Sequence, residues 1–482
     1  MYKEKEPFVA ENENKELPKR DFTINDEYFS GIETEGYGCG KELDYKNASD
    51  DAVDIDSGAQ EVSGRQLLCW EGSAIHTAND ASVYVRDSYI WGDTEFETLP
   101  IAGPPGNLLV SGNIRTTLGF GQSQNYYINS TVVSRNWAVL STDGARPALQ
   151  EGQKELSLFA YGSAAIGLSG GYGTYSDLFC RIFVYGTLFR VPEIGVISGT
   201  YGKVDIGTIG DGEKNEELSS VLRESDMALR KDKSLGSVIE AGRNALMIHS
   251  VNLPPYWEFE GYSKEEIPLY VAPVNARKTV FRTDLSLDGA VEYDPPKQAY
   301  IDHTAGSVIL IKSTNTDVYL DGCELIADPA GTGAIVHTVY NNDTMFMNAV
   351  PDGEHYPGIK ITMKEMKVKG DIIHEDYQRG LTMRLSGTEY EGAANEYGCD
   401  HWNKVSSEKG FGEYCLEGSY KTHHGLKVVL ENGSSWKVTG RSTLTGLRVG
   451  KGSRIIGKIS LDGREMICAE GETYEGEIVI EP

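Results

Sequence analysis

Short runs of alternating apolar and polar residues, each closed by Gly, Asn or Asp, recur along most of the chain. Each run reads apolar-x-apolar, then a turn residue, then small-x-apolar. The copies are residues 83–90, 126–132, 318–325, 383–390, 428–434 and 447–453. Alternation with a period of two predicts β-strands, and Gly or Asn suits the positive-φ positions of sharp bends. We therefore expect short strands joined by tight bends, with little helix.

The intervals between the copies predict how the strands stack. Equivalent residues recur from Gly433 to Gly452, from Ser88 to Ser130 and from Gly322 to Gly387. These intervals are close to one, two and three multiples of about 20–22 residues, and a period of that size is the signature of a solenoid. One coil cannot bury its apolar face alone, so the coils must stack.

Over about residues 80–482 the repeats resemble the right-handed parallel β-helices of the pectate-lyase-like superfamily. The expected fold is all-β, a single right-handed parallel β-helix solenoid over 53–482, with an N-terminal tail and cap in 1–52. Residues 213–230 have loose helical spacing and are expected to form a helical insertion. Residues 395–424 read as a second insertion.

Charge and composition narrow the class of protein. The chain has 45 Lys and Arg against 72 Asp and Glu, a net charge of −27, which argues against a nucleic-acid partner. No apolar stretch approaches the length of a membrane span, so no membrane partner is expected. The seven cysteines include no CxxC pair and read as reduced thiols. The N-terminus has no apolar signal core, so the chain as written is expected to be cytoplasmic, with a mature secreted form left open.

A second repeat carries titratable groups. Residues 247–250, 310–313, 335–338 and 372–375 each read as two apolar residues, His or Lys, and a small or acidic residue. Equivalent positions of successive coils stack at about 4.8 Å. We therefore expect His249, Lys312, His337 and His374 to form one column, with three coils between the first two and one coil between each later pair.

The column suggests acid/base chemistry, because histidine is the side chain whose charge changes near neutral pH. His249 and His337 are candidate acid/base residues, and Lys312 would stabilise developing negative charge. His374, oriented by neighbouring Glu375 and Asp376, would bind an anionic group together with Arg379. The alternative is that these residues only end strands and bond to carbonyls of the next bend.

Two segments are longer than a bend between strands requires, and they contain more aromatic residues than a surface loop without a binding role usually has. Residues 251–270 contain Tyr256 and Trp257, and residues 339–357 contain Phe346. Long loops on one face of a repeat scaffold commonly carry binding function, and these three rings would stack on a substrate. Loop self-packing or an oligomer contact is the alternative.

Two further stretches supply weaker candidates. Tyr172 and Tyr175 lie in the Gly-rich stretch 169–177, where either hydroxyl could donate a proton or simply pack in a turn. No GK[ST] follows, so nucleotide binding is rejected. Asp143 and Arg146 follow a weaker copy of the second repeat and could contact substrate.

Metal sites are not strongly indicated. Four acidic side chains could offer oxygen ligands to Ca²⁺ but lack EF-hand spacing; they are Asp50, Asp51, Asp54 and Asp56. A Cys- and His-containing set fits no usual zinc spacing; it comprises Cys399, His401, Cys415, His423 and His424. No other cofactor is expected.

Three functions follow from these residues. The resemblance implies an enzyme acting on a carbohydrate or glycosidic substrate by general acid/base chemistry, as a lyase or hydrolase. A loop-covered pocket would instead suit an isomerase or hydratase of a small hydrophobic or aromatic metabolite. The regular coils of 425–459 would suit a non-catalytic adhesin or structural β-helix. The exposed aromatic loops also predict a homodimer or homotrimer.

Overall fold

The computed structural model describes most of the chain from residue 53 onward. The described residues are 53–55, 57–69, 73–92, 98–100, 108–110, 115–135, 138–145, 151–168, 171–176, 179–199, 201–249, 269–287, 304–339, 356–376, 378–397 and 425–482. They divide into two compact units. Unit 1 lies within Met1–Ile197, Ile206–Ala241 and Ser286–Asp294, and unit 2 within Ser198–Asp205, Gly242–Leu285 and Pro295–Pro482.

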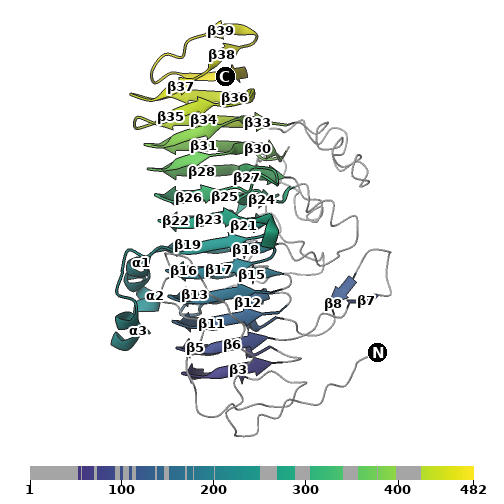
Figure 1. Ribbon diagram of the computed structural model, residues 1–482, viewed down its shortest axis with the longest axis vertical. Coiled ribbons are helices and arrows are strands. Elements are labelled where there is room, and N and C mark those ends of the chain that lie inside the picture. The colour runs from purple at the N-terminus through teal and green to yellow at the C-terminus, as the bar shows by residue number, and fades with distance from the viewer. Residues whose placement is uncertain are drawn as a thin grey trace. The chain divides into compact units, whose positions relative to one another are not determined.

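Unit 1 is a stack of parallel coils with three strands in each (Figure 1). One row pairs β1 (Val53–Ile55), β4 (Ile75–Thr77), β9 (Thr117–Gly121), β12 (Ala138–Ala145), β15 (Tyr172–Ser176) and β18 (Ile194–Ser198). The second pairs β2 (Ala59–Ser63), β5 (Ser82–Arg86), β10 (Gln124–Ile128), β13 (Ser157–Tyr161) and β16 (Arg181–Tyr185). The third pairs β3 (Gln66–Cys69), β6 (Tyr89–Gly92), β11 (Thr131–Ser134), β14 (Ala164–Gly167), β17 (Leu188–Val191) and β20 (Val238–Ala241). A separate antiparallel pair joins β7 (Thr98–Pro100) and β8 (Leu108–Val110).

Unit 2 repeats this arrangement. One row pairs β21 (Asn244–His249), β24 (Ile309–Lys312), β27 (Ala334–Val339), β30 (Asp371–Glu375) and β33 (Ala394–Glu396). The second pairs β22 (Val271–Arg277), β25 (Asn315–Asp321), β28 (Ile359–Lys364), β31 (Leu381–Ser386), β34 (Leu426–Glu431) and β36 (Ser442–Val449). The third side carries β23 (Val280–Thr283), β26 (Glu324–Ile326), β29 (Lys367–Lys369), β32 (Glu389–Gly392), β35 (Ser435–Val438) and β37 (Arg454–Ile456). β19 (Lys203–Gly207) begins in this unit, and a 3₁₀-helix spans Leu285–Leu287.

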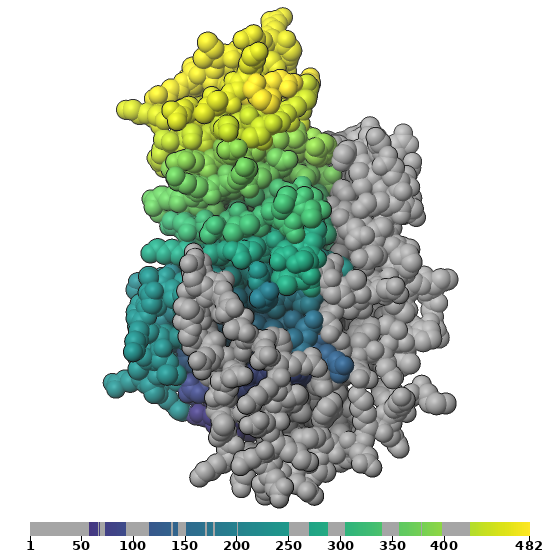
Figure 2. All heavy atoms as spheres, in the orientation of Figure 1, coloured from purple at the N-terminus to yellow at the C-terminus, as the bar shows by residue number. Residues whose placement is uncertain are grey.

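The C-terminal end of unit 2 changes from parallel to antiparallel pairing. β40 (Thr473–Glu481) runs antiparallel to β36 and β38 (Lys458–Leu461), and β38 also pairs with β39 (Arg464–Met466). An antiparallel strand covers the edge that an open parallel stack would leave for other chains. These residues form the yellow surface in Figure 2.

The strand pattern and its register confirm the expected all-β parallel β-helix solenoid, within both units. The positive-φ bends are confirmed as well. In unit 1 they fall at Asp87, Asn129, Gly162 and Gly186, and in unit 2 at Gly322, Gly387, Gly433 and Gly452.

A hydroxyl residue follows each of these bends in unit 1 and links the coils. The backbone N–H of Ser88 donates to Ser130 Oγ at 3.2 Å, and that of Ser130 donates to Ser163 Oγ at 3.1 Å. The ladder continues from Ser163 to Thr187 and from Thr187 to Ser237. Buried bend N–H groups thereby find partners that a strand ladder would otherwise supply.

The expected coil length is correct for some coils and wrong for others. β5 pairs directly with β10, so the interval from Ser88 to Ser130 is one coil rather than two. β25, β28 and β31 pair in succession, so Gly322 to Gly387 spans two coils rather than three. The steps from β28 to β31 and from β34 to β36 have the expected length. Loop length can vary because closing a longer surface loop costs only slightly more free energy.

Three short helices replace the single helix expected over 213–230. They are α1 (Ile209–Lys214), α2 (Glu216–Ser219) and α3 (Glu224–Leu229). The helix is interrupted between α1 and α2 at Asn215. The Asn215 side chain accepts the Leu218 N–H and so starts α2. An N-capping residue of this kind favours a new helix over continuation of the old one.

The helices cover an aromatic stack on the outer side of unit 1. The rings of Tyr84, Tyr126, Phe159 and Phe183 lie parallel, with successive centroids 4.9, 4.6 and 4.7 Å apart. Ile209 and Leu218 of the helices pack into the same cluster. Figure 1 shows α1–α3 beside the strands of this unit. Burial of these apolar groups supplies the main reason for the insertion to dock.

Candidate functional site

The candidate site lies in unit 2, on the sheet formed by β21, β24, β27 and β30. His249 pairs with Lys312 across β21 and β24. Lys312 then pairs with Val339, and Val339 with Glu375. The row of equivalent positions is therefore His249, Lys312, Val339 and Glu375.

The expected column is correct for His249 and Lys312 and wrong for His337 and His374. His337 pairs with Leu310, two residues before the row. His374 pairs with Thr338, one residue before it. The interval from His249 to Lys312 is one coil, not three. The offset arises because Lys312 pairs with Val339, which lies two residues beyond His337. The register between β27 and β30 also shifts between Ala334 and Val336.

Strand alternation decides which side chains face one another. His374 shares its face with Ile372, Ile311 and Ile248, which are fully buried core residues. Its Nδ1 lies 2.6 Å from Thr338 Oγ1 on the neighbouring strand. Successive strand residues point to opposite faces, so Glu375 and His337 lie on the other side of the sheet. Glu375 therefore does not orient His374.

His337 and Glu375 form a buried hydrogen-bonded pair. His337 Nε2 lies 2.9 Å from Glu375 Oε2, and the two residues are 1% and 3% exposed. On the other side of the ring, His337 Nδ1 lies 3.2 Å from Ser307 Oγ. Ser307 Oγ in turn lies 2.8 Å from Thr332 Oγ1, which accepts the Ala334 N–H.

The ionisation of Glu375 sets the direction of the protons in this set of contacts. With Glu375 as a carboxylate, His337 Nε2 carries the hydrogen and donates it, and Nδ1 is the acceptor. Ser307 then donates to His337 Nδ1 and accepts from Thr332. A histidine placed between a carboxylate and a hydroxyl is the arrangement that general acid/base groups use.

Two charged groups, Asp376 and Arg379, lie in the bend that follows Glu375. Arg379 Nη1 is 3.3 Å from Asp376 Oδ2, and both side chains are buried. Burial raises the pKa of Asp376, and the Arg379 guanidinium opposes that rise. The Arg379 Cζ lies 4.3 Å from the centroid of the Tyr356 ring. Arg379 is thus engaged with Asp376 and Tyr356 within the protein.

Tyr397 adds a hydroxyl near Glu375. Its backbone N–H donates to the His374 carbonyl at 2.8 Å. Burial, followed by the negative charges of Glu375 and Asp371, raises the pKa of Tyr397. A tyrosine that stays protonated can donate a hydrogen bond or a proton.

No sequence pattern indicates Ser307, Thr332 or Tyr397, and the expectation that Glu375 orients His374 is wrong, because Glu375 contacts His337. Parity along the strand was the available signal for Glu375, because adjacent strand residues cannot share a face. Ser307 and Thr332 precede their strands in loops, and no spacing in the sequence places them beside His337.

The other predicted residues are distributed as follows. Tyr172 and Tyr175 are half-buried in unit 1 and lie in strand β15 rather than in a bend. Their rings are 5.8 Å apart, and Arg115 Cζ lies 5.4 Å from the Tyr175 centroid. Asp143 lies in β12. Arg146, Tyr256, Trp257 and Phe346 lie outside the described residues.

Most of the predicted metal ligands lie outside the described residues. Asp54 lies in β1, while Asp50, Asp51 and Asp56 are outside the described residues, as are Cys399, His401, Cys415, His423 and His424. Within the described ranges, no group of three His, Cys, Asp or Glu side chains is placed to hold a metal ion. No helix in the described part of the chain is both long enough and apolar enough to cross a membrane.

No protein-family model matches the sequence, and neither a curated protein nor a solved structure is detectably similar to it. Function must therefore be inferred from the site itself.

Proposed function

We propose that the protein is a β-helix enzyme that acts on a carbohydrate or glycosidic substrate by general acid/base chemistry, as a lyase or hydrolase. The observation that carries the proposal is the buried pair of His337 and Glu375. The second ring nitrogen of His337 is hydrogen-bonded to the Ser307 hydroxyl. The resemblance to pectate-lyase-like β-helices supplies the substrate class, by analogy of fold.

The position of the pair supports a catalytic role over a structural one. Both groups lie on the side of the sheet that faces away from the apolar core, where a β-helix could carry ordinary apolar or solvated side chains. Desolvating two ionisable groups is costly, and well-packed apolar residues of similar size would serve stability as well or better. Such groups are often retained where they perform chemistry.

His249 and Lys312 extend the same face towards solvent. Both are half-buried and occupy adjacent positions of one row, and Lys312 is a diagonal neighbour of His337 across β24 and β27. A Lys ammonium at that position would stabilise negative charge that develops as His337 removes a proton. The Ser307 hydroxyl would give its proton to Nδ1 as it receives one from the substrate, while Nε2 keeps its hydrogen bond to Glu375.

The test is turnover on three groups of compounds: uronate-containing oligosaccharides, neutral glycosides and small aromatic metabolites. A positioned acid/base group is typically worth about 10²–10⁴ in rate, so His337→Gln and Glu375→Gln should each lower kcat by that order. Lys312→Met should lower it as well. The matched control is Lys360→Met, which removes a half-exposed ion pair with Asp317 on the second sheet row of unit 2.

The outcomes separate the candidate functions. Turnover of aromatic metabolites alone would move the assignment to an isomerase or hydratase. Saccharide binding without turnover would indicate an adhesin. Wild-type turnover in all three variants would exclude this face as the active site. Light scattering against the monomer mass of 52.9 kDa tests the proposed homodimer or homotrimer.

A further inference from the structure

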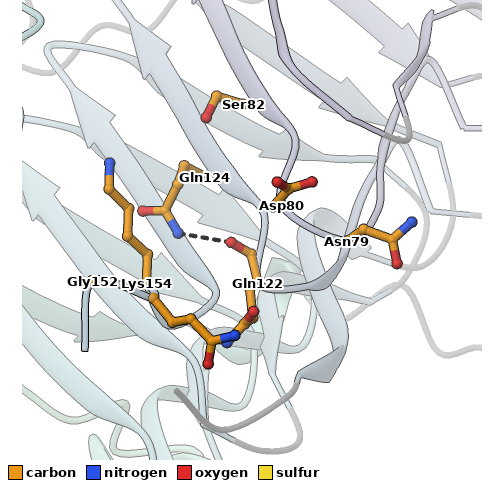
Figure 3. Close-up of a pocket in the computed structure, with 8 residues that line it drawn as sticks. Asn79, Asp80, Ser82, Gln122, Gln124, Gly152 and Lys154 are labelled. Carbon is orange, nitrogen blue, oxygen red and sulfur yellow. Dashed lines mark hydrogen bonds between the residues drawn. The ribbon is translucent and has the colours of Figure 1, made fainter. Parts of the chain in front are cut away.

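Unit 1 contains a polar hollow that the proposed acid/base site does not use. Its volume is about 480 Å³, within the range of small-molecule sites. The side chains that line it are polar, and Figure 3 shows Asn79, Asp80, Ser82, Gln122, Gln124 and Lys154. Gln153 also lines the hollow.

Three successive coils form this hollow at their bends. Ser82 begins β5 and Gln124 begins β10, and the two residues pair directly in the parallel register. Asn79 holds a left-handed conformation with φ 54° in the bend before β5. Gln153 and Lys154 come from the bend before β13. The solenoid register therefore fixes the walls.

Gln124 is a buried polar side chain in the wall of the hollow. It is 2% exposed, and its Nε2 donates to the carbonyls of Gln122 at 3.0 Å, Ser123 at 3.0 Å and Glu155 at 2.6 Å. Three acceptors around one nitrogen fix which end of the amide is the donor. The oxygen, Oε1, is consequently directed away from these carbonyls.

Gln124 Oε1 is buried and has no hydrogen-bond partner in the described protein. In Figure 3 it points to the side of the hollow where the Lys154 side chain lies. Lys154 is exposed, so its flexible side chain can move aside at little cost. Leaving a buried acceptor unsatisfied costs free energy, and a ligand that donates a hydrogen bond would remove that cost.

We propose that this hollow binds a neutral, hydroxyl-rich ligand, a mono- or disaccharide unit, with one hydroxyl donating to Gln124 Oε1. Sugar hydroxyls both donate and accept, which matches the mixture of carboxamides, the Ser82 hydroxyl, the Asp80 carboxylate and the Lys154 ammonium. The two opposite charges at the rim give no preference for an anionic or a cationic sugar. The assignment is independent of the acid/base site, because it concerns equilibrium binding and not turnover.

Isothermal titration of the full chain with glucose, galactose and cellobiose tests the proposal. A small polar ligand without ring stacking is expected to bind with a Kd in the millimolar range, on the order of 1–10 mM. Glucuronate and glucosamine are the charged comparison probes. Gln124→Met should weaken binding about 3- to 10-fold, the usual effect of one neutral hydrogen bond.

A second variant keeps the test decisive if Gln124→Met does not fold. Ser82→Phe places a ring in the hollow and leaves the three Gln124 hydrogen bonds in place, so it should abolish binding. Gln60→Ala, an exposed amide on β2 outside the hollow, is the matched control and should bind as wild type. His337→Gln should also bind as wild type, which separates this site from the proposed active site.

Three results would overturn the proposal. The first is that the wild-type protein binds no neutral sugar, which would mean that water is the hydrogen-bond donor to Gln124 Oε1. The second is unchanged binding in Ser82→Phe. The third is a clear preference for glucuronate or glucosamine over glucose, which would assign the hollow to a charged ligand.

Discussion

His337 and Glu375 belong to different coils of unit 2, yet their side chains meet at 2.9 Å. They are diagonal neighbours on adjacent strands, because His337 pairs with Ile373 and Glu375 pairs with Val339. Two residues on one face of adjacent strands, offset by two positions, are within reach of long side chains. The pair is thus a product of register, and a one-residue slip between β27 and β30 would separate it.

The first prediction concerns the stability of this pair. His337→Leu or Glu375→Leu alone leaves a buried partner without its hydrogen bond, and each should lower the free energy of unfolding by about 3–5 kcal/mol. The double variant His337→Leu/Glu375→Leu should recover most of that loss while remaining inactive. Urea unfolding of the four proteins provides the measurement. A double variant that regains activity as well as stability would show that the pair is only structural.

The second prediction concerns the bend at Asn129, which has φ 49°. Its Nδ2 donates to the Asp226 carbonyl, and its Oδ1 accepts from Arg230 Nε, both at 3.0 Å. Asn129→Gly and Asn129→Ala both lose these bonds, but only alanine has a Cβ that disfavours the left-handed conformation. Asn129→Ala should therefore be less stable than Asn129→Gly by about 1–2 kcal/mol, as measured by urea unfolding. Equal stabilities would mean that the bend relaxes to another conformation.

The third prediction concerns the docking of α1–α3. Arg86 of β5 forms an ion pair with Asp226 of α3, and the two residues are 3% and 1% exposed. Asp226→Ala leaves the Arg86 charge buried without its partner, and should destabilise unit 1 by about 3–5 kcal/mol. Limited proteolysis should then cut within 209–230 before the rest of the unit.

The control for that experiment is Glu61→Gln, which removes an exposed ion pair with Arg223. Exposed ion pairs contribute little, so proteolysis should follow the wild-type pattern. If Asp226→Ala is cut no faster than Glu61→Gln, the aromatic and aliphatic contacts alone hold the helices in place.

The fourth prediction concerns two cysteines and pH. Burial raises the pKa of Cys180 and that of Cys323 from 9.0 to about 11. Both are free thiols, as the cysteine pattern predicted, so they should react with an aromatic disulfide reagent only as the protein unfolds. Cys180→Ser and Cys323→Ser should accordingly leave the fast-reacting thiol count of the native protein unchanged.

The sign of the pH effect follows from the same shift. The unfolded thiols ionise near pH 9, while the folded ones stay protonated to about pH 11. The stability contributed by this difference is fully present below pH 9 and is lost as the pH rises towards 11. Serine does not titrate in this range, so each variant should lose less stability between pH 9 and 11 than the wild type does. An identical pH profile would show that these thiols are not shielded.

The fold class could be predicted from the sequence because it depends on local rules. A period of two in apolar residues predicts strands, and Asn129, Gly322 or Gly433 after an apolar run predicts a left-handed bend. Each rule uses neighbouring residues alone, and each coil repeats it. The length of a coil does not follow from these rules, so a regular period predicts two coils between Ser88 and Ser130 where the structure has one.

The site depended on relationships that the sequence does not contain. The sequence by itself determined that the strands stack in parallel, that His337 lies on one of them, and that His374 and Glu375 follow one another on another strand. The tertiary structure decided that His337 lies two residues and His374 one residue before the row of His249 and Lys312, which brings Glu375 to His337 and directs His374 into the core. It also decided that three bends meet around Gln124. The physical reason is that inter-strand register is set by the packing of whole coils and by loop lengths between them, and a change of one residue moves a side chain to the opposite face.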